Sequence, residues 1–163
     1  MMTEKSAGFL LISDDIETQD YSVLLLHYAS GHWDFPKGNI ETDETELEAA
    51  TRELQEETGI ETFSLIPNFR YVLDYKYTRN NMLVSKQVTL FLASTGERKV
   101  RISHEHIGYS WAKNNEAITQ LTYKNAKNAL KNAIDEGIES GLARNFNAGK
   151  HLEKLKSAKR QNG

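Results

Sequence analysis

Two apolar stretches near the start of the chain are separated by a polar segment. Residues 7–12 and 21–27 are rich in leucine, valine, isoleucine and phenylalanine, whereas residues 13–20 are mostly polar. Short apolar runs of this kind are typical of buried strands. We therefore predict two strands joined by a loop. We expect residues 31–38 to be irregular, because glycine and proline interrupt any regular pattern there.

The segment from Asp43 to Thr58 has the periodicity of an amphipathic helix. Its apolar residues at positions 47, 50 and 54 share one face, which we expect to pack on a sheet. Asp43 is the predicted N-cap, because Glu46 follows three residues later and acidic side chains fill the first turn. Gly59 is the predicted left-handed C-cap.

The second half of the chain predicts a strand pair and then a helix. Residues 69–75 and 87–93 have strand character and are joined by a polar connection, and residues 100–103 and 109–111 are shorter strand candidates. From residue 115 onward, apolar residues recur with helical spacing and form one face, which consists of Ala126, Ala129, Leu130, Ala133, Ile134 and Ile138.

Length and composition narrow the class of protein. The 163 residues suit one domain, which we place at residues 1–143, followed by a flexible basic tail at residues 144–163. The chain has no cysteine, which excludes disulfides, thiolate zinc sites and a cysteine nucleophile. It has no apolar run long enough to cross a bilayer and no signal-peptide pattern, so we expect a cytoplasmic protein without membrane contact.

The net charge of −3 is the sum of two unlike parts. Six of the 20 basic residues and one of the 23 acidic residues lie in the tail, which therefore carries +5. The first 143 residues hold the other 14 bases and 22 acids, a net charge of −8. We expect the tail to be a solvated segment, with an RNA-binding arm as the alternative.

Three glutamates, Glu53, Glu56 and Glu57, are spaced so that they project from one face of the predicted helix. A cluster of this kind is usually a solvated charged surface. Here the carboxylates follow a glycine-containing loop, where a bound cation would offset their mutual repulsion. Hard oxygen ligands suit Mg²⁺ or Mn²⁺.

The spacing around these glutamates resembles the Nudix box. Gly38 is followed after five residues by Glu44, and after seven more by Arg52-Glu53-Leu54-Gln55-Glu56-Glu57-Thr58-Gly59-Ile60. Every fixed position of the box is matched. The resemblance to the Nudix hydrolases implies an α/β/α sandwich, in which the box forms a loop–helix–loop on a mixed sheet. It also implies a divalent cation, Mg²⁺ or Mn²⁺, that bridges a diphosphate and helps to activate water.

The same resemblance implies a role for each residue of the box. The implied metal ligands are the carbonyl of Gly38 and the carboxylates of Glu53, Glu56 and Glu57. The implied catalytic carboxylates are Glu53, Glu57 and Glu105, of which Glu105 lies outside the box as an extra ligand or base. Arg52 would fix the rotamer of a glutamate, and Glu44 would support the site without binding the metal directly.

Within the Nudix hydrolases, the chain resembles the diadenosine tetraphosphate hydrolases of the animal and archaeal type, also called bis(5′-nucleosyl)-tetraphosphatases. The resemblance rests on Trp33-Asp34-Phe35-Pro36-Lys37-Gly38 before the box, on residues 101–106 and on Tyr123. It implies phosphate contacts from lysine and histidine and an adenine clamped between tyrosine rings. The implied substrate-binding residues are His32, Lys37, Tyr75, Lys86 and Tyr123.

The expected activity is the hydrolysis of a phosphoanhydride in a small nucleotide by a monomer, with diadenosine tetraphosphate split asymmetrically into ATP and AMP. A 5′-triphosphorylated RNA or a diphosphoinositol polyphosphate is the alternative substrate, which the negative charge of residues 1–143 disfavours. A non-catalytic nucleotide-binding regulator on the same fold is a third interpretation. The presence of all three box glutamates favours the enzyme.

Overall fold

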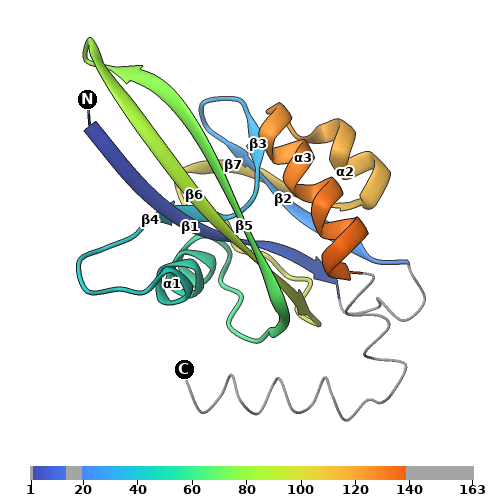
Figure 1. Ribbon diagram of the computed structural model, residues 1–163. Coiled ribbons are helices and arrows are strands. Elements are labelled where there is room, and N and C mark those ends of the chain that lie inside the picture. The colour runs from blue at the N-terminus through green and yellow to red at the C-terminus, as the bar shows by residue number, and fades with distance from the viewer. Residues whose placement is uncertain (1, 14–19, 139–163) are drawn as a thin grey trace.

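The structure is a computed structural model that describes residues 2–13 and 20–138 (Figure 1). Its elements in chain order are β1 (Met2–Ser13), β2 (Ser22–Tyr28), β3 (Trp33–Asp34), β4 (Lys37–Asn39), α1 (Glu46–Thr58), β5 (Ser64–Arg79), β6 (Met82–Thr95), β7 (His106–Lys113), α2 (Asn114–Gln120), α3 (Lys124–Asn132) and the π-helical turn η2 (Ala133–Ile138). Within these ranges, no helix has the length and apolar character needed to cross a membrane.

The strands form one mixed sheet of seven strands, with the order β3-β2-β1-β6-β5 along its main path. β1 and β6 lie parallel, in a register that runs from Met2–Val84 to Ser13–Thr95, and the other pairs are antiparallel. β4 also pairs with β1, and β7 pairs with β2. Because β4 leads directly into the loop before α1, its pairing with β1 anchors that loop to the middle of the sheet.

Helices cover both faces of the sheet (Figure 1). Alternate residues of β1 point to opposite faces, so that Phe9 and Leu11 belong to the core beneath α1, whereas Leu10 and Ile12 belong to the core beneath α2, α3 and η2. All four side chains are fully buried. This arrangement confirms the predicted α/β/α sandwich with a mixed sheet.

β5 and β6 extend well beyond the predicted strands 69–75 and 87–93. They form one long hairpin that includes most of the segment expected to be a polar connection. Asn80 and Asn81 make its turn with φ values of 52° and 62°, which asparagine tolerates better than most residues. The end of the hairpin is largely exposed, and this is why its polar sequence did not have the pattern of a buried strand.

Two other local predictions were wrong. Residues 100–103 do not form a strand; the backbone N–H of Arg101 instead donates to the carbonyl of Thr58 at 2.9 Å, which attaches this segment to the end of α1. Residues 31–38, expected to be irregular, contain the short strands β3 and β4. The conformation of both segments is set by contacts with residues that are distant in the chain. A local sequence pattern does not show such contacts.

The helical pattern after residue 115 corresponds to three elements, α2, α3 and η2, instead of one helix. The predicted apolar face is directed towards the core as expected. A Cβ atom at Gly137 would lie 2.7 Å from Leu92 and 2.9 Å from Phe69, so the absence of a side chain lets η2 approach the sheet closely. The predicted domain boundary at residue 143 and the basic tail lie outside the described residues.

α1 begins later than predicted. Thr45 is its N-cap, because the Thr45 hydroxyl accepts from the backbone N–H of Glu48 at 3.1 Å while the Glu48 carboxylate accepts from the N–H of Thr45 at 2.9 Å. Asp43, the predicted N-cap, precedes this capping box with a φ of 70°. The helix ends as predicted at Gly59, which has a φ of 78°.

The capping box predicts that Thr45→Ala lowers the free energy of unfolding by about 1 kcal/mol, because the Glu48 N–H loses its acceptor. Asp43→Gly is the matched control. Its backbone conformation suits glycine, so we expect a change below about 0.5 kcal/mol. Urea denaturation followed by circular dichroism measures both variants, and equal losses would contradict this assignment of the N-cap.

Candidate active site

β4, the short strand that leads into the loop before α1, contacts the helix through a glycine. A Cβ atom at Gly38 would lie 2.0 Å from the carboxyl carbon of Glu53, so any side chain at this position would displace that carboxylate. The contact keeps the Glu53 side chain only 15% exposed. Burial raises the pKa of Glu53, and the neighbouring Arg52 opposes the effect. Gly38 therefore allows a partly buried carboxylate to lie directly against the loop backbone.

Arg52 binds the acidic side chains around this contact. Its guanidinium donates two hydrogen bonds to Glu44 at 2.7 and 2.9 Å, one to Glu53 at 2.8 Å and one to Glu56 at 3.1 Å. A further hydrogen bond reaches the carbonyl of Asn39 at 3.0 Å. The hydrogen bonds from Arg52 lower the pKa of Glu44 to about 2. Arg52 therefore joins the loop to the helix and offsets the repulsion between the carboxylates.

Glu57 lies on the buried side of α1, with 4% of its side chain exposed. One carboxylate oxygen accepts from the backbone N–H of Lys37 at 2.9 Å, and the other lies 3.4 Å from Nε2 of His106. Burial raises the pKa of Glu57 to about 7, although His106 acts in the opposite direction. An ionised carboxylate held in this environment gains from a nearby positive charge.

An aromatic side chain that was not expected from the sequence packs against the histidines of this region. Tyr28, near the end of β2, donates from its hydroxyl to the carbonyl of Phe35 at 2.8 Å. Its ring contacts His106 edge-on, with 4.5 Å between centroids, and stacks on His32 at 4.6 Å. A tyrosine at the end of a strand is ordinary, so no signal in the sequence marked it.

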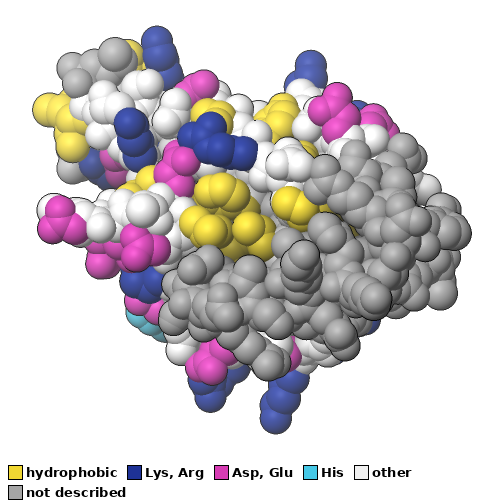
Figure 2. Space-filling view, turned by 60° about the horizontal axis from the view of Figure 1, so that its bottom comes forward, with side chains coloured by type: hydrophobic (Ala, Val, Ile, Leu, Met, Phe, Trp, Pro, Cys, Tyr) yellow, Lys and Arg dark blue, Asp and Glu magenta, His cyan; other side chains and the backbone are white. Residues whose placement is uncertain are grey.

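Negative charge collects around α1. Glu41, Asp43 and Glu48 are exposed in the loop and first turn. In Figure 2, acidic side chains lie along the left side of the face, where Figure 1 places the loop before α1. Such a concentration of charge raises the local concentration of cations.

The carboxylates fit a divalent cation by their chemistry. Within the described part of the chain, no three histidine, aspartate or glutamate side chains converge into a ready-made metal site. The donors expected from the box are nevertheless all oxygens: the carbonyl of Gly38 and the carboxylates of Glu53, Glu56 and Glu57. Glu53 fills the space that a side chain at Gly38 would take, so carboxylate and loop backbone already lie together. Oxygen donors of this kind suit Mg²⁺ or Mn²⁺.

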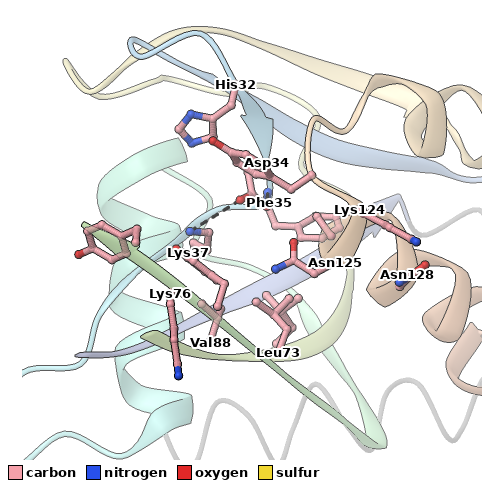
Figure 3. A pocket seen from close by; sticks show the side chains of 15 residues that line it. His32, Asp34, Phe35, Lys37, Leu73, Lys76, Val88, Lys124, Asn125 and Asn128 are labelled. Carbon is pink, nitrogen blue, oxygen red and sulfur yellow. Dashed lines mark hydrogen bonds and ion pairs between the residues drawn. The ribbon is translucent and has the colours of Figure 1, made fainter. Parts of the chain in front are cut away.

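A cavity of about 670 Å³ opens beside Lys37 (Figure 3). Tyr75 of β5, Tyr123 at the start of α3, and His32 line it together with Lys37. Apolar side chains make up much of the remaining wall: Phe35, Leu73, Val88, Leu90 and Ala126. A cavity of this size, with a largely apolar wall and a few polar groups, suits a small organic ligand.

The polar side chains at one end of this cavity are held in place by neighbours. The ring of His32 lies 5.4 Å from that of Tyr123, and burial lowers the pKa of His32. Nζ of Lys37 lies 3.7 Å from the carboxylate of Asp34, which is itself buried. These contacts direct a lysine and a histidine towards the same cavity as the two tyrosines.

Lys86 and Glu105 complete the set of predicted site residues. Lys86 of β6 lies directly opposite Tyr75 in the β5–β6 ladder and therefore shares its face of the sheet. Burial and the positive charge of Lys37 lower the pKa of Lys86. Glu105 is exposed in the turn before β7, and its negative charge contributes to the raised pKa of Glu53. The structure thus brings His32, Lys37, Tyr75 and Tyr123 to one cavity, which Lys86 does not line, and it places Glu53 against Gly38 and Glu57 against the N–H of Lys37. Glu56 and Glu105 are exposed.

Comparisons with known proteins agree with this geometry. Residues 2–133 match the NUDIX domain family. The rat protein named bis(5′-nucleosyl)-tetraphosphatase [asymmetrical] is 34% identical over 122 residues, which cover 71% of this chain and 80% of the rat protein. An RNA pyrophosphohydrolase of Stenotrophomonas maltophilia is 41% identical over 83 residues, 44% of this chain and 40% of that protein. An Ap4A hydrolase of Caenorhabditis elegans, solved as a binary complex, superimposes with a TM-score of 0.65 at 26% identity and covers 78% of this chain and 93% of its own.

The contact at Gly38 predicts that Gly38→Ala reduces turnover by at least about 100-fold, because the added methyl group displaces the Glu53 carboxylate. Binding of Mn²⁺, followed by electron paramagnetic resonance, is expected to weaken in parallel. Gly108→Ala is the control, because its Cβ would lie 3.8 Å from the nearest atom, on His27. Unchanged metal binding in Gly38→Ala would contradict the role given to this contact.

The buried carboxylate predicts that Glu57→Gln stabilises the protein in a chelating buffer at pH 8. The amide oxygen can still accept from the N–H of Lys37, while the cost of an ionised buried group is removed. The pKa of Glu57 is raised to about 7 in the fold, so wild-type stability falls as the pH rises from about 4.5 to 7. We expect a gain on the order of 2 kcal/mol at pH 8 and little at pH 5. Thermal denaturation at both pH values measures it, and a loss at pH 8 would contradict the argument.

Proposed function

The chain belongs to the Nudix hydrolase family, and we propose that it hydrolyses a phosphoanhydride bond of dinucleoside polyphosphates, with diadenosine tetraphosphate split asymmetrically into ATP and AMP. The relatives that carry this name are similar along most of their length, including the rat protein at 34% identity. Nudix hydrolases generally use a divalent cation, and for this chain we propose Mg²⁺ or Mn²⁺.

The observation that carries the proposal is the position of Lys37 between the carboxylates of α1 and the cavity. Its backbone N–H is held by Glu57 of α1 at 2.9 Å, while its side chain lines the cavity with Tyr75 and Tyr123. A ligand whose base occupies the cavity would therefore direct its phosphates past a lysine towards the carboxylates of α1. This is the arrangement that a nucleotide with a polyphosphate chain requires.

The carboxylates and the loop would hold the cation. The proposed ligands are the carbonyl of Gly38 and the carboxylates of Glu53, Glu56 and Glu57. The cation, when bound, neutralises charge that develops on the phosphate oxygens and lowers the pKa of bound water. Arg52 positions Glu53 and Glu56 through its hydrogen bonds, and Glu44 positions Arg52 in turn.

We assign proton transfer to the carboxylates near the proposed cation ligands. Glu53 and Glu57, four residues apart in α1, are the first two candidates to take a proton from water. Glu105 is the third candidate base, because its turn lies close enough for its charge to act on Glu53.

The cavity residues would bind the nucleotide. Stacking of adenine between Tyr75 and Tyr123 contributes about 1–3 kcal/mol per base and tolerates different bases. Lys37 and Lys86 offer positive charge to the phosphates, and Lys86 lies opposite Tyr75 in the sheet. His32 is held against Tyr28 and Tyr123, in position to donate a hydrogen bond to a phosphate oxygen.

The cavity favours this substrate over the alternatives. A 5′-triphosphorylated RNA and a diphosphoinositol polyphosphate are polyanions that a strongly basic surface would bind best, whereas this wall is largely apolar and tyrosine-rich. The RNA pyrophosphohydrolases are similar over a much shorter segment, 83 residues of the first of them. A non-catalytic role is disfavoured, because all the box carboxylates are present.

We further propose that the enzyme acts as a cytoplasmic monomer on a small-molecule substrate. Light scattering after size-exclusion chromatography would then give a mass near 18.5 kDa.

The proposal predicts the products directly. Incubation of the protein with Mg²⁺ and diadenosine tetraphosphate, followed by ion-exchange separation of nucleotides, is expected to give ATP and AMP in equal amounts. Glu56→Gln, which removes one proposed ligand at an exposed site, is expected to lower the rate by at least about 1,000-fold without loss of the fold. Formation of two ADP molecules would refute the asymmetrical cleavage. Turnover of 5′-triphosphorylated RNA or an inositol pyrophosphate alone would favour the alternative substrates.

A further inference from the structure

Asn125 is a polar side chain of the cavity that has no assigned role in the site described above. The carboxylate of Asp34 accepts from the N–H of Phe35 at 2.8 Å and lies 3.7 Å from Lys37, and Nδ1 of His32 lies 2.8 Å from the hydroxyl of Ser30. Asn125 also lines the cavity and is half-buried. Its side-chain amide makes no hydrogen bond to any residue within 2–13 or 20–138.

Asn125 is well placed to meet a base in the cavity. It lies in the first turn of α3, two residues after Tyr123. Figure 3 shows its amide directed into the cavity above Leu73, whereas Lys124 and Asn128 lie towards the rim. Two other α3 residues that line the cavity, Lys124 and Asn128, are exposed, whereas Asn125 is half-buried. Its side chain is a neutral amide.

Stacking on the two tyrosines cannot by itself select one base, and an amide could supply that selectivity. Stacking on aromatic rings holds a base by its faces and distinguishes poorly between bases. Discrimination has to come from hydrogen bonds at the edge of the base. An asparagine amide carries a donor and an acceptor side by side, and this pair is complementary to the amino group and adjacent ring nitrogen of adenine.

We propose that the Asn125 amide reads the edge of an adenine held between Tyr75 and Tyr123, accepting from the exocyclic amino group and donating to the adjacent ring nitrogen. The inference rests on the proposed function, since it assigns base selectivity to the same cavity. A base that leaves the half-buried amide unpaired binds less tightly, because the amide then loses hydrogen bonds to water without replacing them.

The test compares the binding of two mononucleotides that differ only at the amino group. Calorimetry gives the dissociation constants of AMP and purine riboside 5′-monophosphate, which lacks that group, for the wild-type protein and for Asn125→Leu. The wild-type protein is expected to bind AMP about 10-fold more tightly than the analogue. Asn125→Leu is expected to bind the two ligands within about 2-fold of each other. Because the ligands are mononucleotides, the result does not depend on hydrolysis of a dinucleoside polyphosphate.

Two further variants separate base recognition from a change in the fold. Asn132→Leu, on α3 and outside the residues that line the cavity, is expected to keep the full preference for AMP. Asn125→Asp keeps the shape of the side chain but only accepts, so an acceptor then faces the ring nitrogen of adenine, and this variant is expected to bind AMP more weakly than the wild-type protein. Equal binding of AMP and the analogue by the wild type, or an unchanged preference in Asn125→Leu, would overturn the inference. A failure to cleave diadenosine tetraphosphate would count against the proposed function instead.

Discussion

The charge balance around Arg52 is the interaction on which the site depends. One guanidinium serves the carboxylates of Glu44, Glu53 and Glu56 and also binds a carbonyl of the loop that carries Gly38. Without it, the acidic side chains would repel one another, and the hydrogen bond from the Lys37 N–H to Glu57 would remain as an attachment of this segment to α1. The single positive charge does not balance three carboxylates, so the site keeps a negative charge that a divalent cation would offset. The same contacts that organise the site therefore leave it in need of a metal.

Lys37 connects the carboxylates of α1 with the cavity, because its backbone contacts Glu57 and its side chain lines the cavity. The segment from Trp33 to Asn39 runs between the core beneath α3 and the core beneath α1, and the short strands β3 and β4 fix it to the sheet. Glu57 holds the backbone of Lys37, and Asp34 holds its side chain. The separation between the cavity and the carboxylates is thus set by a hydrogen-bonded segment of the sheet. Such preorganisation limits the entropy lost when a long, flexible substrate is bound.

The sequence predicted those features that depend on neighbours in the chain. The spacing of the box predicted the helix and its cap at Gly59, because both follow from local helical geometry. The predicted common face of the three box glutamates stays a prediction, since Glu57 lies on the buried side of α1 whereas Glu56 is exposed. The sequence pattern misplaced the N-cap, since Asp43 and Thr45 are each followed by a glutamate three residues later, and only the backbone conformation separates them. It also missed Tyr28 and Asn125, whose positions depend on contacts between distant segments. The full length of the β5–β6 hairpin was not predicted, because the residues at its exposed end do not alternate between buried and exposed positions.

The parallel pairing of β1 with β6 also affects how the chain reaches this fold. Each pair in that register, from Met2–Val84 to Ser13–Thr95, joins residues 82 positions apart. At a synthesis rate of roughly 5–20 residues per second, β1 leaves the ribosome several seconds before its parallel partner is made. Its last eight residues are all buried in the finished sheet. Antiparallel pairing with β4 and β2, which are much closer in the chain, gives β1 its early protection. The short strand β4 is therefore available to pair with one edge of this hydrophobic segment before β6 is made, whereas the other edge stays open until β6 pairs with it.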